Sequence, residues 1–235
     1  MKNNEILVKD LGVLSYDKSW EHQKRIFDNI VSQKINNRTL KKKIKTENHL
    51  LIVEHKPIYT IGKSGEISNL LLDDQELKLK GIDFKKINRG GDITFHGLGQ
   101  IVGYPILDLD NFFTDIGLYL RTLEEVIIST IDFFGIKGFR IDGETGVWVK
   151  DESNSLKKIC AFGIKASRWV TMHGFALNVN TDLTYFDNIV PCGISDKGVT
   201  SLQEILNQKI TTKTVKEKLY ENIARLFNAE LSMTN

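Results

Sequence analysis

The sequence of 235 residues lacks the features of secreted, membrane and nucleic-acid-binding proteins. It has only two cysteines, Cys160 and Cys192, too few for a disulfide framework, so we expect free thiols in a reducing cytoplasm. No apolar run approaches the ~18 residues of a membrane span. The opening stretch, MKNNEILVKD, carries acidic residues and no long apolar core, unlike a signal peptide. A net charge of +2 is too small to favour nucleic acid or a membrane as partner.

Metal and nucleotide motifs are lacking as well. The five histidines never pair at i, i+4 and the cysteines do not form a CxxC pair, so no metal site is predicted. IGKS (61–64) resembles the end of a P-loop, but Pro57 stands where that motif begins with glycine. GLGQIVG (97–103) has Val102 where a dinucleotide fingerprint needs its third glycine. We therefore expect no cofactor.

Periodic patterns along the chain predict one α+β domain, residues 1–235, with a mixed, mostly antiparallel sheet flanked by helices. Helices are predicted over 16–34, from an N-cap at Thr114 to Gly135, and over 214–227. Strands are predicted over 49–55, 100–109, 146–150, 158–166 and 173–180, with 151–155 as a hairpin loop. Nothing in the sequence demands an oligomer, so we expect a monomer.

One stretch is strongly basic and has no acidic residue. A solvated surface and a docking patch for an acidic partner are both compatible with such a run. The basic residues are Lys34, Arg38, Lys41, Lys42, Lys43 and Lys45.

Two glycine-flanked segments contain groups able to do chemistry. PCGI (191–194) places Cys192 between Pro191 and Gly193, a turn that exposes a thiol, so Cys192 is a nucleophile, a packing residue or an idle thiol. A thiol with a pKa near ~8.5 is mostly protonated at neutral pH and needs a partner to act as a nucleophile. A lysine can be that partner, either as a base or as a cation that favours the thiolate.

The segment KKICAFGIK (157–165) supplies candidate lysines. Regular strand alternation places Lys158 on one face with Cys160, Phe162 and Ile164. Because burial on an apolar face perturbs a lysine, this favours Lys158, although a solvated lysine at a strand end is the alternative.

Several segments, in this order, resemble the lipoyl(octanoyl) transferases of lipoate biosynthesis. They are HKPIYTIG (55–62), RGGDITFHGLGQ (89–100), KICAFG (158–163), MHGFALNV (172–179) and PCGI (191–194). The resemblance spans roughly residues 10 to 205 and implies the fold of the lipoate and biotin protein ligases. It also implies a Cys/Lys pair, Cys192 as nucleophile and Lys158 as its partner.

The resemblance further implies the substrates and the residues that hold them. The donor is octanoyl-acyl carrier protein, and the acceptors are lysines on the lipoyl domains of 2-oxoacid dehydrogenase E2 subunits and on the glycine cleavage H protein. We expect glycines near the site to let an acyl chain lie against the backbone. The expected substrate-binding residues are Arg89, Gly90, Gly91, Asp92, Ile93, Thr94, Phe95, His96, Ala161, Phe162, Gly163, Gly174, Phe175 and Ala176.

Some points stay open at this stage. Leu98 replaces the usual proline of the family's His-Gly-Pro-Gly-Gln segment, and Cys160 stands where alanine is common; we expect Cys160 to be a packing residue. Arg89 and His96 have other possible roles, as a surface ion pair and a loop histidine. An ATP-dependent lipoate or biotin protein ligase and a non-catalytic binder of acylated carrier protein are the alternative functions.

Overall fold

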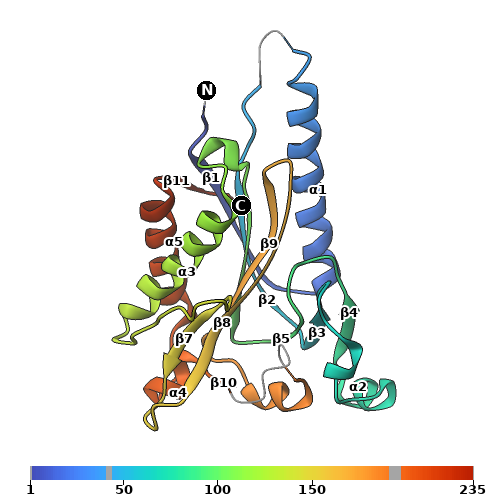
Figure 1. The fold of residues 1–235 in the computed structure, drawn as a ribbon, viewed down its shortest axis with the longest axis vertical. Coiled ribbons are helices and arrows are strands. Elements are labelled where there is room, and N and C mark those ends of the chain that lie inside the picture. The colour runs from blue at the N-terminus through green and yellow to red at the C-terminus, as the bar shows by residue number, and fades with distance from the viewer. Residues whose placement is uncertain (1, 41–43, 191–196, 235) are drawn as a thin grey trace.

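The computed structural model describes residues 2–40, 44–190 and 197–234. Its centre is a large mixed sheet with helices on both faces (Figure 1). The strand order is β10-β8-β9-β6-β2-β1-β11, with β7 beside β8. The strands are β1 (Glu5–Leu14), β2 (His49–His55), β6 (Gln100–Ile106), β7 (Val147–Lys150), β8 (Leu156–Ser167), β9 (Val170–Asn178), β10 (Gly198–Val199) and β11 (Glu230–Met233). Pairing from β2 through β6, β9 and β8 to β7 is antiparallel, so the predicted mixed, mostly antiparallel sheet is confirmed.

Apolar side chains cover both faces of this sheet. Helices α3 (Ile116–Asp132) and α5 (Thr212–Phe227) pack on one face, where Val126 and Leu219 are buried. Helix α1 (Tyr16–Asn36) covers the other face through Phe27 and Ile30. Strands buried on both faces read as continuous apolar runs, which explains the sequence of β2.

The predicted helices and strands are present, with one error at a helix start and one at a strand end. Strand β6 ends at Ile106 and not at residue 109, because Leu109 begins a short 3-10 helix, Leu109–Asn111. Asp115, not Thr114, is the N-cap of α3, and its Oδ1 accepts a hydrogen bond of 2.9 Å from the N–H of Leu118. Threonine and aspartate are both good N-caps, so the sequence alone does not separate the two neighbours. The loop 151–155 joins β7 to β8 as a hairpin, as expected.

A second, smaller sheet lies beside the large one and was not predicted as a unit. It consists of β3 (Ile58–Ile61), β4 (Asp83–Lys86) and β5 (Ile93–His96), with helix α2 (Asp74–Lys80) packed close by. The Tyr59 and Phe95 rings, 5.6 Å apart, form part of its apolar core. This sheet positions the RGGDITFH stretch, because residues 93–96 are its strand β5.

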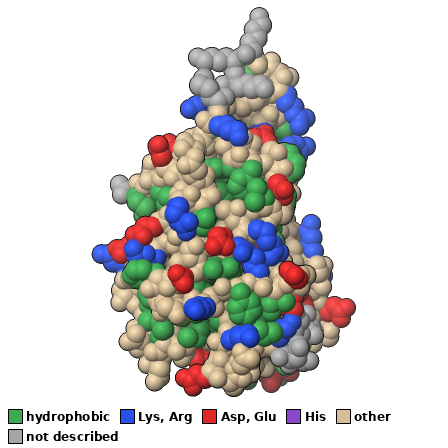
Figure 2. Space-filling view, turned by 60° about the vertical axis from the view of Figure 1, so that its left-hand side comes forward, with side chains coloured by type: hydrophobic (Ala, Val, Ile, Leu, Met, Phe, Trp, Pro, Cys, Tyr) green, Lys and Arg blue, Asp and Glu red, His purple; other side chains and the backbone are tan. Residues whose placement is uncertain are grey.

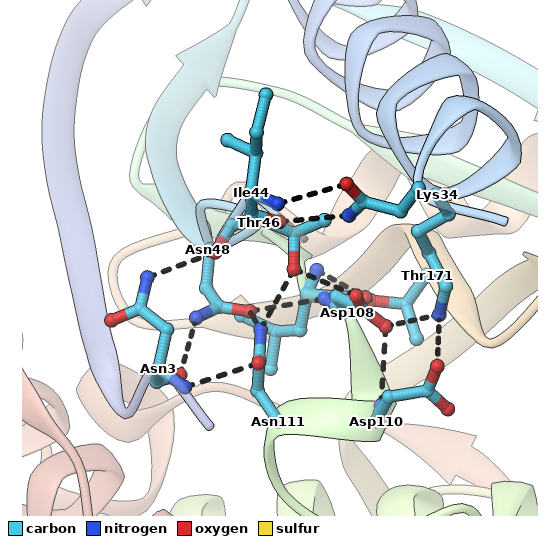
Figure 3. Close-up of polar contacts among 11 residues, drawn as sticks. Asn3, Lys34, Ile44, Thr46, Asn48, Asp108, Asp110, Asn111 and Thr171 are labelled. Carbon is cyan, nitrogen blue, oxygen red and sulfur yellow. Dashed lines mark hydrogen bonds and ion pairs between the residues drawn. The ribbon is translucent and has the colours of Figure 1, made fainter. Parts of the chain in front are cut away.

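A buried aspartate joins several distant segments near the C-terminal end of α1 (Figure 3). Asp108 accepts a hydrogen bond of 2.7 Å from the Thr46 hydroxyl and forms an ion pair with Lys34. Asn48 accepts the Asp108 backbone N–H at 3.1 Å. Because Lys34 also pairs with Asp110 at 2.8 Å, it is not a free member of the basic run.

The remaining surface features are ordinary. Lys41, Lys42 and Lys43 lie outside the described residues, so the expected basic patch is described only in part. On the face drawn in Figure 2, basic and acidic side chains alternate without a large patch of one sign. Among the described helices, none is long and apolar enough to cross a membrane.

Candidate active site

A cavity of about 310 Å³ has strands β8 and β9 of the large sheet on one side and the RGGDITFH stretch (89–96) on the other. One end, here called the lysine end, is formed by Glu144, Thr145, Lys158 and Val199. The opposite part, here called the histidine end, contains Tyr16, Arg89, His96 and His173. Along β8, Lys158 lies six residues before Ile164, the partner of His173 in β9, so the two ends are separated along the strand.

Most of the expected binding residues line this cavity. Gly90 and Phe95 do not: the Phe95 ring stacks on Tyr185 at 4.5 Å inside the core of the small sheet. Cys192 lies outside the described residues. The expected residues that do line the cavity are Arg89, Gly91, Asp92, Ile93, Thr94, His96, Lys158, Ala161, Phe162, Gly163, Gly174, Phe175 and Ala176.

Lys158 reaches the cavity because of a β-bulge that regular alternation does not anticipate. Val147 pairs with Cys160 while Trp148 pairs with Lys158, so Ile159 is an extra residue in β8. Ile159 and Cys160 are both fully buried in the α3/α5 core, whereas Lys158 lines the cavity. The prediction that Lys158 and Cys160 share a face was therefore wrong, although it selected the lysine that lines the cavity.

Three glycines, Gly62, Gly163 and Gly174, lie where another part of the chain comes very close to their Cα atoms. A Cβ on Gly163 would lie 2.6 Å from Arg89 Cδ, and one on Gly174 would lie 2.1 Å from the Gly103 carbonyl oxygen. A Cβ on Gly62 would lie 2.1 Å from the carbonyl oxygen of Gly91. Such distances are far below van der Waals contact, so the absence of a side chain lets segments of backbone approach each other. A Cβ on Gly91, which also lines the cavity, would meet only the Arg89 side chain at 3.3 Å and the Phe162 carbonyl oxygen at 4.0 Å, so the expectation that glycines make room for an acyl chain stays a prediction there.

A continuous hydrogen-bonded chain runs through the histidine end. Arg89 is buried, so it does not lie on the surface, and it donates to the carbonyl oxygen of Thr60 at 2.8 Å and to its hydroxyl at 3.1 Å. His96 contacts Thr60 Oγ1 through Nε2 at 3.3 Å and Gln100 Oε1 through Nδ1 at 2.9 Å. Because the Gln100 amide nitrogen donates to Asn178 Oδ1 at 2.9 Å, its carbonyl oxygen faces His96. His96 therefore donates from Nδ1 and accepts at Nε2, as a neutral imidazole does.

Burial keeps three histidines of this region neutral. Burial lowers the pKa of His96 to about 3, with smaller contributions from His55 and Arg89. Burial also lowers the pKa of His173 to about 3 and that of His55 to about 4. His55 Nδ1 faces the Leu14 carbonyl at 2.9 Å, so its Nε2 accepts the Tyr104 hydroxyl at 2.8 Å.

Of the two cysteines, the structure describes only Cys160. Cys160 is fully buried in the apolar core and burial raises the pKa of its thiol well above the usual value, so it is unreactive and its predicted packing role is confirmed. Cys192 remains a sequence-based candidate.

Sequence reasoning missed several residues of the cavity wall. Tyr16 comes from α1, Gln100 from β6, and His173 and Asn178 from β9, and the lysine end adds Glu144. Gln100 and His173 lie within the quoted motifs, so motif membership could have pointed to them. Tyr16 and Glu144 gave no local signal, since only the tertiary fold brings them to the cavity.

The arrangement suits a ligand with an apolar chain and a reactive group near Lys158. Apolar side chains line the middle of the cavity, including Val102, Phe162 and Phe175. Burying apolar chain atoms there is favourable by ~0.8 kcal/mol per methylene. A lysine at one end adds a group able to carry or accept a proton.

Comparison with known proteins gives concordant matches. Residues 15–224 match the family described as lipoyl protein ligase A/B catalytic domain. The octanoyltransferase of Christiangramia forsetii is 57% identical over 230 residues, 97% of this chain and 98% of that protein. The octanoyltransferase of Flavobacterium johnsoniae is 55% identical over 97% of this chain and 99% of its own length.

Solved structures share the fold at low sequence identity. A bi-partite lipoate protein ligase from Thermoplasma acidophilum, studied with its E2 lipoyl domain, has a TM-score of 0.68 at 16% identity, covering 100% of this chain and 88% of its own. Lipoate-protein ligase A bound with ATP has a TM-score of 0.67 at 16% identity, covering 100% of this chain and 90% of its own. The expected lipoate-ligase-like fold is confirmed.

Proposed function

The chain belongs to the lipoyl protein ligase A/B catalytic domain family, among its octanoyltransferases, and from this premise we propose how it transfers its acyl group. The octanoyl group comes from octanoyl-acyl carrier protein, passes through a thioester on Cys192, and ends on a lysine of a lipoyl domain. The whole of residues 1–235 acts as one catalytic domain, as a monomer in the cytoplasm. The acceptors are E2 subunits of 2-oxoacid dehydrogenases and the glycine cleavage H protein.

One observation carries the proposal: Lys158 lines the end of an apolar cavity beside the strand that follows the PCGI segment. Strand β10 pairs in parallel with β8, with Gly198 opposite Lys157 and Val199 opposite Lys158. Val199 lines the cavity together with Lys158. An acyl chain in the apolar part of the cavity would gain on the order of 5 kcal/mol from burial of its methylenes.

The chemistry has two balanced steps. In the first, the Cys192 thiolate attacks the carbonyl carbon of the donor thioester; a new C–S bond forms, the old one breaks, and the leaving carrier thiolate takes a proton from the Lys158 ammonium. In the second, the acceptor amine attacks the Cys192 thioester; a C–N bond forms, the C–S bond breaks, and Lys158 takes the amine proton. A thioester becomes an amide, which is downhill, so no nucleotide is consumed.

Intact-mass measurement with octanoyl carrier protein tests the proposal. We expect a covalent octanoyl adduct that is lost in Cys192→Ser, kept in Cys160→Ala as the matched cysteine control, and formed much more slowly in Lys158→Ala. Addition of a lipoyl domain should discharge the adduct onto the acceptor lysine. An adduct that survives Cys192→Ser would overturn the assignment of the nucleophile. Acylation of the lipoyl domain only from free octanoate and ATP would indicate a ligase instead.

A further inference from the structure

The lysine end holds two cations on one aromatic ring. Trp148, on β7, is buried, and the Lys158 ammonium lies 4.6 Å from its ring centroid. The Lys197 ammonium lies 5.4 Å from the same centroid. Both distances are within the range of a cation–π interaction, in which the negative face of the ring attracts an ammonium group.

The side chain of Lys158 is held by packing and not by a carboxylate. A Cβ on Gly146 would lie 3.0 Å from Lys158 Cε, so the glycine makes room for the lysine stem. Among the residues that the structure describes, Lys158 forms no ion pair. Its charge is therefore available to a substrate or to the nucleophile, which is what the proposed reaction requires.

A carboxylate nevertheless lies at the same end of the cavity. Glu144 lines the lysine end, and its Oε1 forms an ion pair with Lys197. The side chains of Lys197 and Glu144 are only 17% and 22% exposed. Glu144 Oε2 is buried and has no hydrogen-bond partner among the described residues. A partly buried carboxylate with an unused oxygen attracts any flexible cation nearby.

We propose that Lys197 is a positioning residue for Lys158. Its ion pair with Glu144 keeps that carboxylate from binding Lys158, so the Lys158 ammonium stays on the Trp148 ring. Without Lys197, the flexible four-carbon stem of Lys158 turns toward Glu144, and the resulting ion pair withdraws the amine from the reaction. With Lys197 in place, two cations and one anion leave the lysine end with a net positive charge. This inference rests on the role proposed above for Lys158.

A double-mutant cycle tests the inference. The measured quantity is the single-turnover rate of octanoyl-adduct formation in the full chain, for wild type, Lys197→Met, Glu144→Gln, the double variant and Lys158→Ala. We expect Lys197→Met to slow acylation by roughly ten- to a hundredfold, the scale of misplacing a catalytic group by about 1 Å. Glu144→Gln should cost less than Lys197→Met. The double variant should recover most of the lost rate, because no carboxylate remains to capture Lys158.

Other outcomes would overturn the inference. If Lys197 merely tethers the chain through its ion pair, Glu144→Gln, Lys197→Met and the double variant should be equally slow. If Lys197 acts through its own charge, the double variant should stay as slow as Lys197→Met. A Lys158→Ala protein as fast as wild type would instead contradict the proposed function itself. Thermal unfolding of each variant separates these effects from a loss of the folded state.

Discussion

At the scale of single residues, two glycines of the cavity wall, Gly163 and Gly174, are required by close contacts within the protein. Gly174 is the sharpest case, because a Cβ there would lie 2.1 Å from the Gly103 carbonyl oxygen and 2.6 Å from Pro105 Cδ. These are parts of β6, the strand paired with β9. Neither a carbonyl in a sheet ladder nor a proline ring can move aside easily, so the methyl group would force the two strands apart.

We therefore predict that Gly174→Ala destabilises the fold by more than about 3 kcal/mol, the upper range of overpacking. The control is Gly117→Ala in the first turn of α3, where a Cβ meets only a side-chain oxygen of Asp115 at 3.2 Å. Alanine is the better helix former by about 1 kcal/mol, so this variant should be as stable as wild type or slightly more stable. Urea unfolding of both variants measures the difference. Equal stabilities would mean that β6 and β9 can move apart at Gly174 at little cost in free energy.

Residue identity in the site was more predictable than residue geometry. Motifs selected Lys158 and most of the cavity wall, because spaced glycines and polar residues leave a recognisable pattern. The bulge at Ile159 was not predictable, since an extra strand residue is visible only once β7 and β8 are paired. The same limit applies to Glu144 and Lys197, whose ion pair joins residues far apart in sequence.

At the scale of elements, the ion pair and hydrogen bonds of Asp108 connect α1 to segments next to the large sheet (Figure 3). Lys34 comes from the last turn of α1, Thr46 from the segment before β2, and Asp108 from the segment after β6. The aspartate side chain is only 4% exposed, so its charge and hydrogen bonds are compensated within the protein.

Asp108→Ala should lower the free energy of unfolding by about 2–4 kcal/mol, because it leaves the partly buried Lys34 and Thr46 without this acceptor. Asp28→Ala is the matched control, since Asp28 pairs with Lys24 on the exposed side of the same helix. Its loss should cost less than about 0.5 kcal/mol, as is usual for exposed ion pairs. Denaturant midpoints of the two variants measure the two losses of stability. Similar midpoints would mean that Asp108 contributes no more to stability than Asp28 does.

Elements with a strong period were predicted well, and elements defined by their partners were not. The apolar stripe of α5 and the apolar run of β2 can be recognised in the sequence, because burial imposes their patterns. Strand β1, however, alternates weakly and is exposed along much of its length. It is ordered by parallel pairing with β2 and with β11 at the far end of the chain. Local sequence carries little information on such long-range pairing.

At the scale of the whole molecule, the cavity depends on two sheets and a helix that meet around neutral histidines. His55 lies in β2, His96 in β5 and His173 in β9, so protonation of any of them places a charge between packed layers. No single segment of the sequence reveals this, because the pKa values follow from burial in the assembled fold.

Stability should therefore fall as the pH drops below neutrality. In the unfolded chain these histidines take up protons near pH ~6.5, whereas in the folded protein they stay neutral until the pH approaches 3 to 4. The unfolded state then binds more protons, so the stability present above pH ~6.5 is lost as the pH falls, by up to about 1.4 kcal/mol per pH unit for each histidine.

Urea unfolding between pH 7.5 and 5.5 measures this slope above the range in which most carboxylates titrate. Replacement of His55, His96 or His173 by glutamine should each reduce the slope by about one proton, whatever the variant's stability at pH 7.5. The slope is the useful quantity, because a glutamine that weakens the hydrogen-bonded chain lowers stability at every pH, whereas only loss of a buried neutral imidazole changes the proton count. A flat profile in wild type, or a slope that the three replacements do not reduce, would mean that these histidines are protonated in the folded protein; His49, whose pKa burial also lowers, contributes a residual slope in every variant.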